Sequence, residues 1–156
     1  MIHIRPAENS DRPALLALIE AQDNFNEEER RVAMEVIDDG LSGRDDYRTL
    51  AAQSEDGRLA GFITFGPIPL TECSYDLYWI ATAPALGRQG IGSRLMAAME
   101  KELRRPGAAV YIDTSSTPGY DRARAFYEKN GYLVAARLKD FYRPGDDRIL
   151  YRKELA

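Results

Sequence analysis

The sequence predicts an α/β fold in which helices flank a central mixed sheet, with the element order β-α-α-β-β-β-α-β-α-β-β. Two observations lead to this prediction. Short apolar or alternating runs, typical of strands, interleave with amphipathic runs typical of helices, and a glycine-bearing loop joins a strand to a helix at residues 87–93. The length of 156 residues suits a single domain over residues 1–156, and no run of linker composition divides it.

Strands are expected where short apolar or alternating runs end at turn residues. The predicted strands are residues 2–5, 49–53, 59–65, 75–81, 109–113, 132–138 and 149–153. Glu55-Asp56-Gly57 predicts a hairpin turn between the second and third strands. The run Pro144-Gly145-Asp146-Asp147 predicts the turn between the last two strands.

Helices are expected where apolar residues recur at helical spacing after a capping residue. The first runs from caps at residues 9–11 to about residue 22, and the second from Asn26 to near Gly40 and Gly43. The other two are predicted at residues 92–104 and 120–129, the last closed by Asn130-Gly131. The charged residues 27–31 are most simply the solvated face of the second helix.

The composition excludes several functions. A net charge of −4 argues against a nucleic-acid partner, because phosphate backbones favour clustered Lys and Arg. The one histidine, His3, is expected on the solvent side of the first strand, and the one cysteine, Cys73, cannot form an internal disulfide, so we expect no metal site and no thiol nucleophile. No apolar run approaches the roughly 20 residues of a membrane span and no secretion signal is visible, so we expect a cytoplasmic protein without a membrane partner.

The run G-R-Q-G-I-G-S at residues 87–93 lies between an apolar stretch ending near Ala81 and an amphipathic stretch beginning at Leu95. Glycines at 90 and 92 let the backbone approach an anion, and the unpaired N–H groups and positive dipole end of the helix point to the same place. The pattern fits a phosphate-binding loop, and it also fits a tight turn used only for packing.

A second motif, A-F-Y-E-K-N-G-Y, follows at residues 125–132 on a predicted helix. With the glycine run and the element order, it resembles the GNAT superfamily of N-acetyltransferases over nearly the whole chain. The strings at residues 113–120 and 140–148 further resemble a bacterial-type subgroup of that superfamily. The family loop Q/R-x-x-G-x-G/A is matched by Gly90 and Gly92, whereas Gly87 stands where the family has Gln or Arg.

The resemblance implies an enzyme that moves an acetyl group from acetyl-CoA directly to a primary amine, without a metal. It implies that the loop backbone binds the pyrophosphate of acetyl-CoA, and that the strand before the loop carries the pantetheine arm and the acetyl carbonyl. The cofactor-binding residues implied in this way are Ile80, Ala81, Thr82, Arg88, Gln89, Gly90, Ile91, Gly92 and Ser93. Tyr120 stands where many members carry an Asn that contacts the cofactor.

Two catalytic residues are implied by position. Tyr127 matches the tyrosine that reaches the sulfur of coenzyme A and donates a proton to the leaving thiolate. Phe126, rotated by about 100° on the helix, is expected to be the packing residue of the pair. Asp76 matches the glutamate base of histone-type members, and burial or a water relay would have to raise its basicity; an acid exposed at a strand start is the alternative.

The acceptor remains open. Asp23, Phe25 and Asn26, between the first two helices, are candidates for substrate binding, and the acceptor is expected to be a small-molecule or peptide amine. Pairing of an exposed final strand between two copies, as a homodimer, also stays open. Two rival functions are a module that binds acetyl-CoA as a sensor or structural ligand without catalysis, and a dinucleotide-binding domain, which would need G-x-G-x-x-G where this chain has G-x-G.

Overall fold

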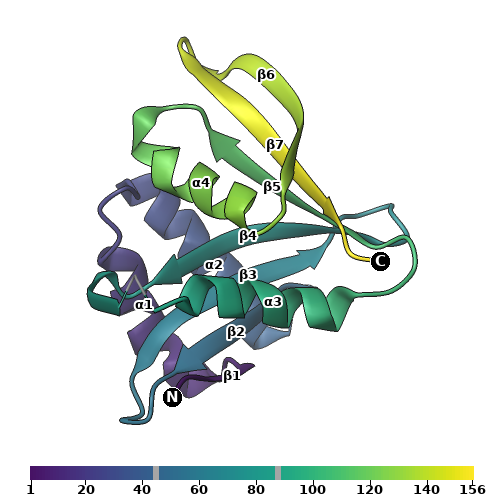
Figure 1. The fold of residues 1–156 in the computed structure, drawn as a ribbon. Helices are drawn as coiled ribbons and strands as arrows, with labels where there is room; N and C mark the ends of the chain where they lie inside the picture. The colour runs from purple at the N-terminus through teal and green to yellow at the C-terminus, as the bar shows by residue number, and fades with distance from the viewer. Residues whose placement is uncertain (44–45, 87–88) are drawn as a thin grey trace.

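The computed structural model describes residues 1–43, 46–86 and 89–156, which form one seven-stranded sheet with helices on both faces (Figure 1). The strands are β1 (His3–Pro6), β2 (Arg48–Gln53), β3 (Leu59–Pro67), β4 (Ser74–Thr82), β5 (Ala109–Ser115), β6 (Leu133–Arg143) and β7 (Asp146–Glu154). The helices are α1 (Arg12–Glu20), α2 (Glu27–Ser42), α3 (Ile91–Leu103) and α4 (Asp121–Lys129), with short 3₁₀ turns η1 (Asn9–Asp11), η2 (Pro84–Leu86) and η3 (Pro118–Tyr120). The predicted fold class and element order are confirmed.

The sheet has the strand order β1-β2-β3-β4-β5-β7-β6, and its one parallel pair is β4 with β5. A parallel pair needs a long crossover, which α3 supplies. This pairing covers only three residues of each strand, Ser74 to Asp76 opposite Ala109 to Tyr111. Beyond Asp76 the two strands diverge, so residues 77–82 of β4 have an open edge toward β5.

An irregularity in β4 lies where the strands part. Phe65 of β3 is opposite Leu77 and Thr64 is opposite Trp79, which leaves Tyr78 as an extra residue in β4. An extra residue of this kind is a β-bulge, which bends its strand and increases the local twist. The bulge therefore helps to turn β4 away from β5.

Two hydrophobic clusters hold the helices to the sheet. On one face, α1 and α2 pack on β3 and β4 through buried residues that include Leu15, Ile37 and Phe62. On the other face, α3 and α4 pack on the strands through a larger cluster that includes Met99 and Tyr127. Figure 1 shows α3 lying across the sheet and α4 beside β5.

The last hairpin differs from its prediction. The strands were expected to end at residue 138 and to resume at residue 149, whereas β6 continues to Arg143 and β7 begins at Asp146. The turn is reduced to Pro144 and Gly145, and Gly145 has a φ of 81°, which favours glycine.

A membrane-crossing helix is absent from the described residues, since none of their helices combines the needed length with an apolar composition.

A buried ion pair joins α3 to the end of β7. Glu100 of α3 is only 5% exposed, and its carboxylate accepts hydrogen bonds from the Lys153 Nζ at 2.8 Å and the Tyr132 hydroxyl at 2.9 Å. The Lys153 ammonium also donates to the carbonyl of Asn130 at 2.9 Å. This group of contacts fixes the C-terminal strand and the end of α4 to α3.

Lys153→Met is expected to lower the free energy of unfolding by about 2–4 kcal/mol, because it leaves the buried Glu100 carboxylate without its main cation. The Arg104 guanidinium, 3.9 Å away, compensates only in part. Urea unfolding measures the loss as a lower midpoint at constant slope. Lys139→Met, which changes an exposed lysine on β6, is the control, and equal midpoints for the two variants would contradict the prediction.

Candidate active site

The open edge of β4 presents main-chain donors toward β5. The Ala83 N–H donates to the carbonyl of Ala60 in β3 at 2.8 Å. Main-chain groups alternate between the two edges of an antiparallel strand, so Ala81 also faces β3, whereas Ile80 and Thr82 face the open edge. In agreement, the Thr82 carbonyl accepts from the Gln22 side chain at 3.0 Å and not from β3. Of the three predicted residues here, Ile80 and Thr82 therefore offer free N–H groups.

The start of α3 lies at the end of this edge. Gly90 is the N-cap residue, with a φ of 70°, and no side chain caps the helix. A Cβ on Gly90 would meet no atom of the described residues within 4 Å, so these residues leave the space outside the helix start open. Ile91 is buried at 1% exposure, which leaves the main chain of Gln89 to Ser93 as the accessible part. The first-turn N–H groups and the positive end of the helix dipole can hold an anion here. Arg88 lies outside the described residues.

Gly92 has a packing role that the glycine pattern did not reveal. A Cβ at this position would lie 3.1 Å from both Cε1 and Cζ of the Phe126 ring. The absence of a side chain lets α4 approach the first turn of α3 closely. The glycine run and the aromatic motif are therefore parts of one contact.

Gly92→Ala is expected to cost about 1–3 kcal/mol of stability, because the added methyl group overpacks the contact with Phe126. The unfolding midpoint measures this loss. Gly119→Ala is the matched control, since a Cβ there would meet nothing within 4 Å. The double variant Gly92→Ala with Phe126→Leu should lose less than the sum of the single changes, and full additivity would contradict the proposed contact.

Tyr127 follows Phe126 on α4 and is 8% exposed. Its ring packs at 5.6 Å from the Tyr151 ring, and burial, with a smaller effect of Tyr151, raises its pKa to about 12. No described residue forms a hydrogen bond with its hydroxyl. Phe126 packs on the first turn of α3 and on the core, as expected, and Tyr127, whose ring lies on Tyr151 of β7, is the more buried of the two.

Asp76 is the last residue of β4 paired with β5, so it lies where the strands diverge. It is partly buried, and this burial raises the pKa of its carboxyl above the usual value. The Asp113 charge adds to the increase, and the Arg148 guanidinium, which is bonded to Asp113 at 2.7 Å, opposes it. Asp76 is thus not the fully exposed strand-start acid of the alternative interpretation.

The predicted substrate residues lie between α1 and α2. Phe25 is buried, with its ring 5.2 Å from the Trp79 ring. The Asn26 side chain caps α2 by accepting from the Glu29 N–H at 2.8 Å. Both side chains therefore stabilise the structure, whereas Asp23 is exposed.

The sequence analysis missed a contact made by the charged run at residues 27–31. Glu29 was expected on a solvated face, yet its carboxylate accepts a hydrogen bond from the Tyr120 hydroxyl. Nearby, Asp146 of β7 is 7% exposed and accepts from the Ser115 hydroxyl at 2.5 Å. The spacing from Asn26 to Glu29 is that of a capping box, which would have indicated a fixed position for the Glu29 side chain.

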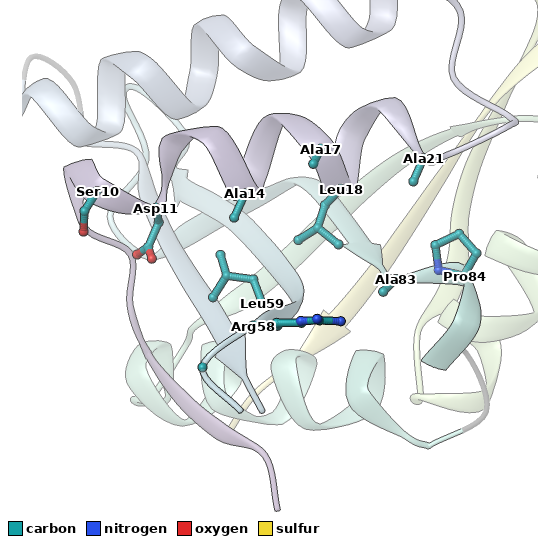
Figure 2. Close-up of a pocket in the computed structure, with 11 residues that line it drawn as sticks. Ser10, Asp11, Ala14, Ala17, Leu18, Ala21, Arg58, Leu59, Ala83 and Pro84 are labelled. Carbon is teal, nitrogen blue, oxygen red and sulfur yellow. The ribbon is translucent and has the colours of Figure 1, made fainter. Parts of the chain in front are cut away.

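A cavity of about 400 Å³ lies elsewhere, between α1, the β2–β3 turn and η2 (Figure 2). Its walls include Ala14 and Ala17 of α1 and Ala21, which follows that helix, with Arg58 opposite. None of its lining residues belongs to α3, α4 or residues 77–82. No group of three His, Cys, Asp or Glu side chains in the described ranges is arranged to hold a metal ion.

Comparisons with known proteins agree with this geometry. The model of the acetyltransferase (GNAT) family matches residues 14–132. A GNAT-family structure from Desulfovibrio desulfuricans is 36% identical, with a TM-score of 0.93 and full coverage of both chains. A search of curated proteins gave no match.

Two more distant structures share the fold. The ribosomal-protein-S18-alanine N-acetyltransferase from Escherichia coli is 22% identical, with a TM-score of 0.77, and 100% of this chain and 95% of that chain are covered. An aminoglycoside 6′-N-acetyltransferase complexed with coenzyme A is 19% identical, with a TM-score of 0.75 and coverage of 99% and 97%. The family match and the 36% identical structure together show that this chain belongs to the acetyltransferase (GNAT) family.

Proposed function

We propose that the chain, as one domain over residues 1–156, transfers an acetyl group from acetyl-CoA directly to a primary amine. One observation carries the proposal: the open β4 edge, the uncapped start of α3 and the unpartnered Tyr127 hydroxyl belong to adjoining elements. The distant relatives with related folds acetylate a protein alanine or an aminoglycoside according to their names, so the family supports amine acceptors of very different size.

The residues present fit acetyl-CoA. The open space at Gly90 and the free first-turn N–H groups suit the pyrophosphate, which the main chain of Gln89 to Ser93 would bind, with Arg88 as a further contact. The N–H groups of Ile80 and Thr82 would hold the pantetheine arm and the acetyl carbonyl. Bound acetyl-CoA supplies an activated thioester, whose carbonyl carbon is attacked by the amine and whose sulfur leaves as a thiolate.

Tyr127 would donate a hydrogen bond to the leaving sulfur. With a pKa of about 12, its hydroxyl stays protonated at neutral pH. Complete proton transfer to a thiolate with a reference pKa near 8.5 is uphill by about 5 kcal/mol. Tyr127 therefore stabilises the negative charge as it develops, and the second proton, which the acceptor nitrogen loses as the amide forms, reaches the thiolate through solvent.

Asp76 would receive the proton of the acceptor amine, directly or through water. An alkylammonium with a pKa near 10.4 must lose a proton before it attacks, which costs about 4.6 kcal/mol at pH 7. A carboxylate with a raised pKa is a better base than an ordinary aspartate, and burial of Asp76 supports this role. Asp23, exposed beyond α1, remains the proposed acceptor contact among the three substrate candidates.

An acetyl-CoA consumption screen with pooled amines, read by thiol release, tests the proposal. Release that depends on both protein and amine is the expected result. Tight acetyl-CoA binding without amine-dependent release would instead support the sensor function. A Tyr127→Phe variant that binds acetyl-CoA normally is the control. Its thiol release should be much lower if the release by the original protein comes from this site.

A further inference from the structure

Glu29 and Tyr120 connect the two halves of the divided sheet. Glu29 belongs to α2, which covers the β1–β4 half, and Tyr120 belongs to η3, which follows β5 (Figure 1). The Tyr120 hydroxyl donates to Glu29 Oε2, and the Asn26 N–H donates to Glu29 Oε1 at 3.1 Å. The Glu29 carboxylate is thus held in place between α2 and η3, with lone pairs left for another donor.

Three carboxylates on α2, β4 and β7 form no ion pair in the described part of the chain, although the Arg148 guanidinium acts on the charge of Asp76. Glu29, Asp76 and Asp146 form no ion pair there, whereas Asp113 is paired with Arg148 at 2.7 Å. The charges of Asp113, Asp146 and Glu29 all act on the Tyr142 hydroxyl, and the Arg148 guanidinium opposes them, so these charged groups lie in one region. The Arg124 guanidinium is engaged by the carbonyls of Ser115 and Thr117 and by Asp121.

Tyr127 places the reaction at the same region. Its side chain is more than nine-tenths buried, its hydroxyl has no hydrogen-bond partner among the described residues, and it interacts electrostatically with the Tyr120 hydroxyl. Tyr120 is itself the donor to Glu29. The unpartnered Tyr127 hydroxyl and the Glu29 and Asp146 carboxylates therefore all lie around the Tyr120 hydroxyl.

The chemistry of amine acetylation decides what these charges recognise. The attacking nitrogen has to be neutral when it forms the new C–N bond, so it cannot provide lasting compensation for the carboxylates. A second cationic group in the acceptor can do so throughout the reaction. An acceptor that carries a carboxylate instead would be repelled.

We propose that the acceptor is a small aliphatic amine with a second cationic group, and that the Glu29 carboxylate binds that group while the other nitrogen is acetylated. The inference rests on the proposed acetyl transfer. Tyr120 acts as a positioning residue, because its hydrogen bond fixes the Glu29 carboxylate from the β5 side of the sheet.

Three acceptors of matched length test the charge requirement: 1,4-diaminobutane, 1-aminobutane and 4-aminobutanoate. The expected order of kcat/KM is the same as this order, with about a tenfold advantage of the diamine over the monoamine at low salt. Equal use of the diamine and the monoamine would overturn the inference and leave the proposed function standing. If no amine releases thiol, both fail.

Glu29→Gln tests the assignment to Glu29. Glutamine keeps the capping box through its amide oxygen, and its NH2 group can donate to the Tyr120 oxygen in place of the bond that Glu29 accepts, so folding should be retained. The variant should lose the diamine advantage through a higher KM for 1,4-diaminobutane, and a retained advantage would overturn the assignment. Glu28→Gln, on the exposed side of α2, is the matched control. Preference for a dilysine peptide over 1,4-diaminobutane would overturn the small-molecule assignment.

Discussion

Tyr127→Phe is expected to reduce kcat by about 10²- to 10⁴-fold, the usual contribution of a positioned proton donor. The change removes one hydroxyl group and keeps the ring that packs on Tyr151. Because that hydroxyl has no hydrogen-bond partner among the described residues, stability should be maintained or slightly increased. Acetyl-CoA affinity should also change little, since the main-chain contacts remain. Steady-state kinetics and calorimetric binding measure the two effects separately.

Tyr151→Phe provides the matched control for this prediction. Tyr151 is also buried, but its hydroxyl contacts Glu128 at 3.4 Å on the other side of the ring pair. Its loss should leave kcat within a fewfold of the original value. Similar kcat values for the Tyr127→Phe variant and the unchanged protein would refute the proton-donor role.

Asp76→Asn is expected to lower kcat/KM by about 10²- to 10³-fold at neutral pH, because the amide cannot accept the acceptor proton. The pH profile provides the second measurement. The acidic limb of the original protein should lie above the ordinary aspartate pKa, and the variant should lack that limb. Asp113→Asn should shift the limb to lower pH, since the Asp113 charge contributes to the raised pKa of Asp76.

The same variant separates catalysis from stability. The folded-state pKa of Asp76 is raised, so the protonated form favours folding; this contribution is present at low pH and is lost as pH rises through the folded pKa. At pH 7 the charged carboxylate therefore opposes folding relative to a neutral amide. Asp76→Asn should unfold at an equal or higher temperature at pH 7, and a large drop would show that Asp76 is mainly structural.

Much of the fold could be predicted because local signals agree with the tertiary structure. The hairpin turn at Asp56-Gly57, the Asn26 cap and the apolar spacing of α3 each specify their element without distant contacts. The extent of β6 could not be predicted in this way. Pro144 and Asp147 suggested a long turn, but pairing with β7 extends both strands almost to Gly145.

The candidate site also contains residues that the sequence predicts and contacts that it does not. Gly90, Gly92 and Tyr127 could be predicted as site residues because they belong to sequence motifs, although their roles remain predictions. The sequence did not predict three other features: the Tyr78 bulge, the contact of Gly92 with Phe126 and the hydrogen bond from Tyr120 to Glu29. Each depends on segments that meet only in the folded protein, and periodicity carries no information about such meetings.

The early separation of β4 and β5 links ligand occupancy to the energetics of the whole protein. Main-chain groups along a free strand edge need partners, and apart from the Gln22 amide at the Thr82 carbonyl, water has to provide them when no ligand is bound. A ligand arm that contains amide groups can form hydrogen bonds with these main-chain groups where β4 and β5 have separated. Saturation at a hundredfold excess over Kd would raise the unfolding free energy by about 2.7 kcal/mol. The concentration of the acyl donor would thus set the free energy of unfolding as well as the rate of acetyl transfer.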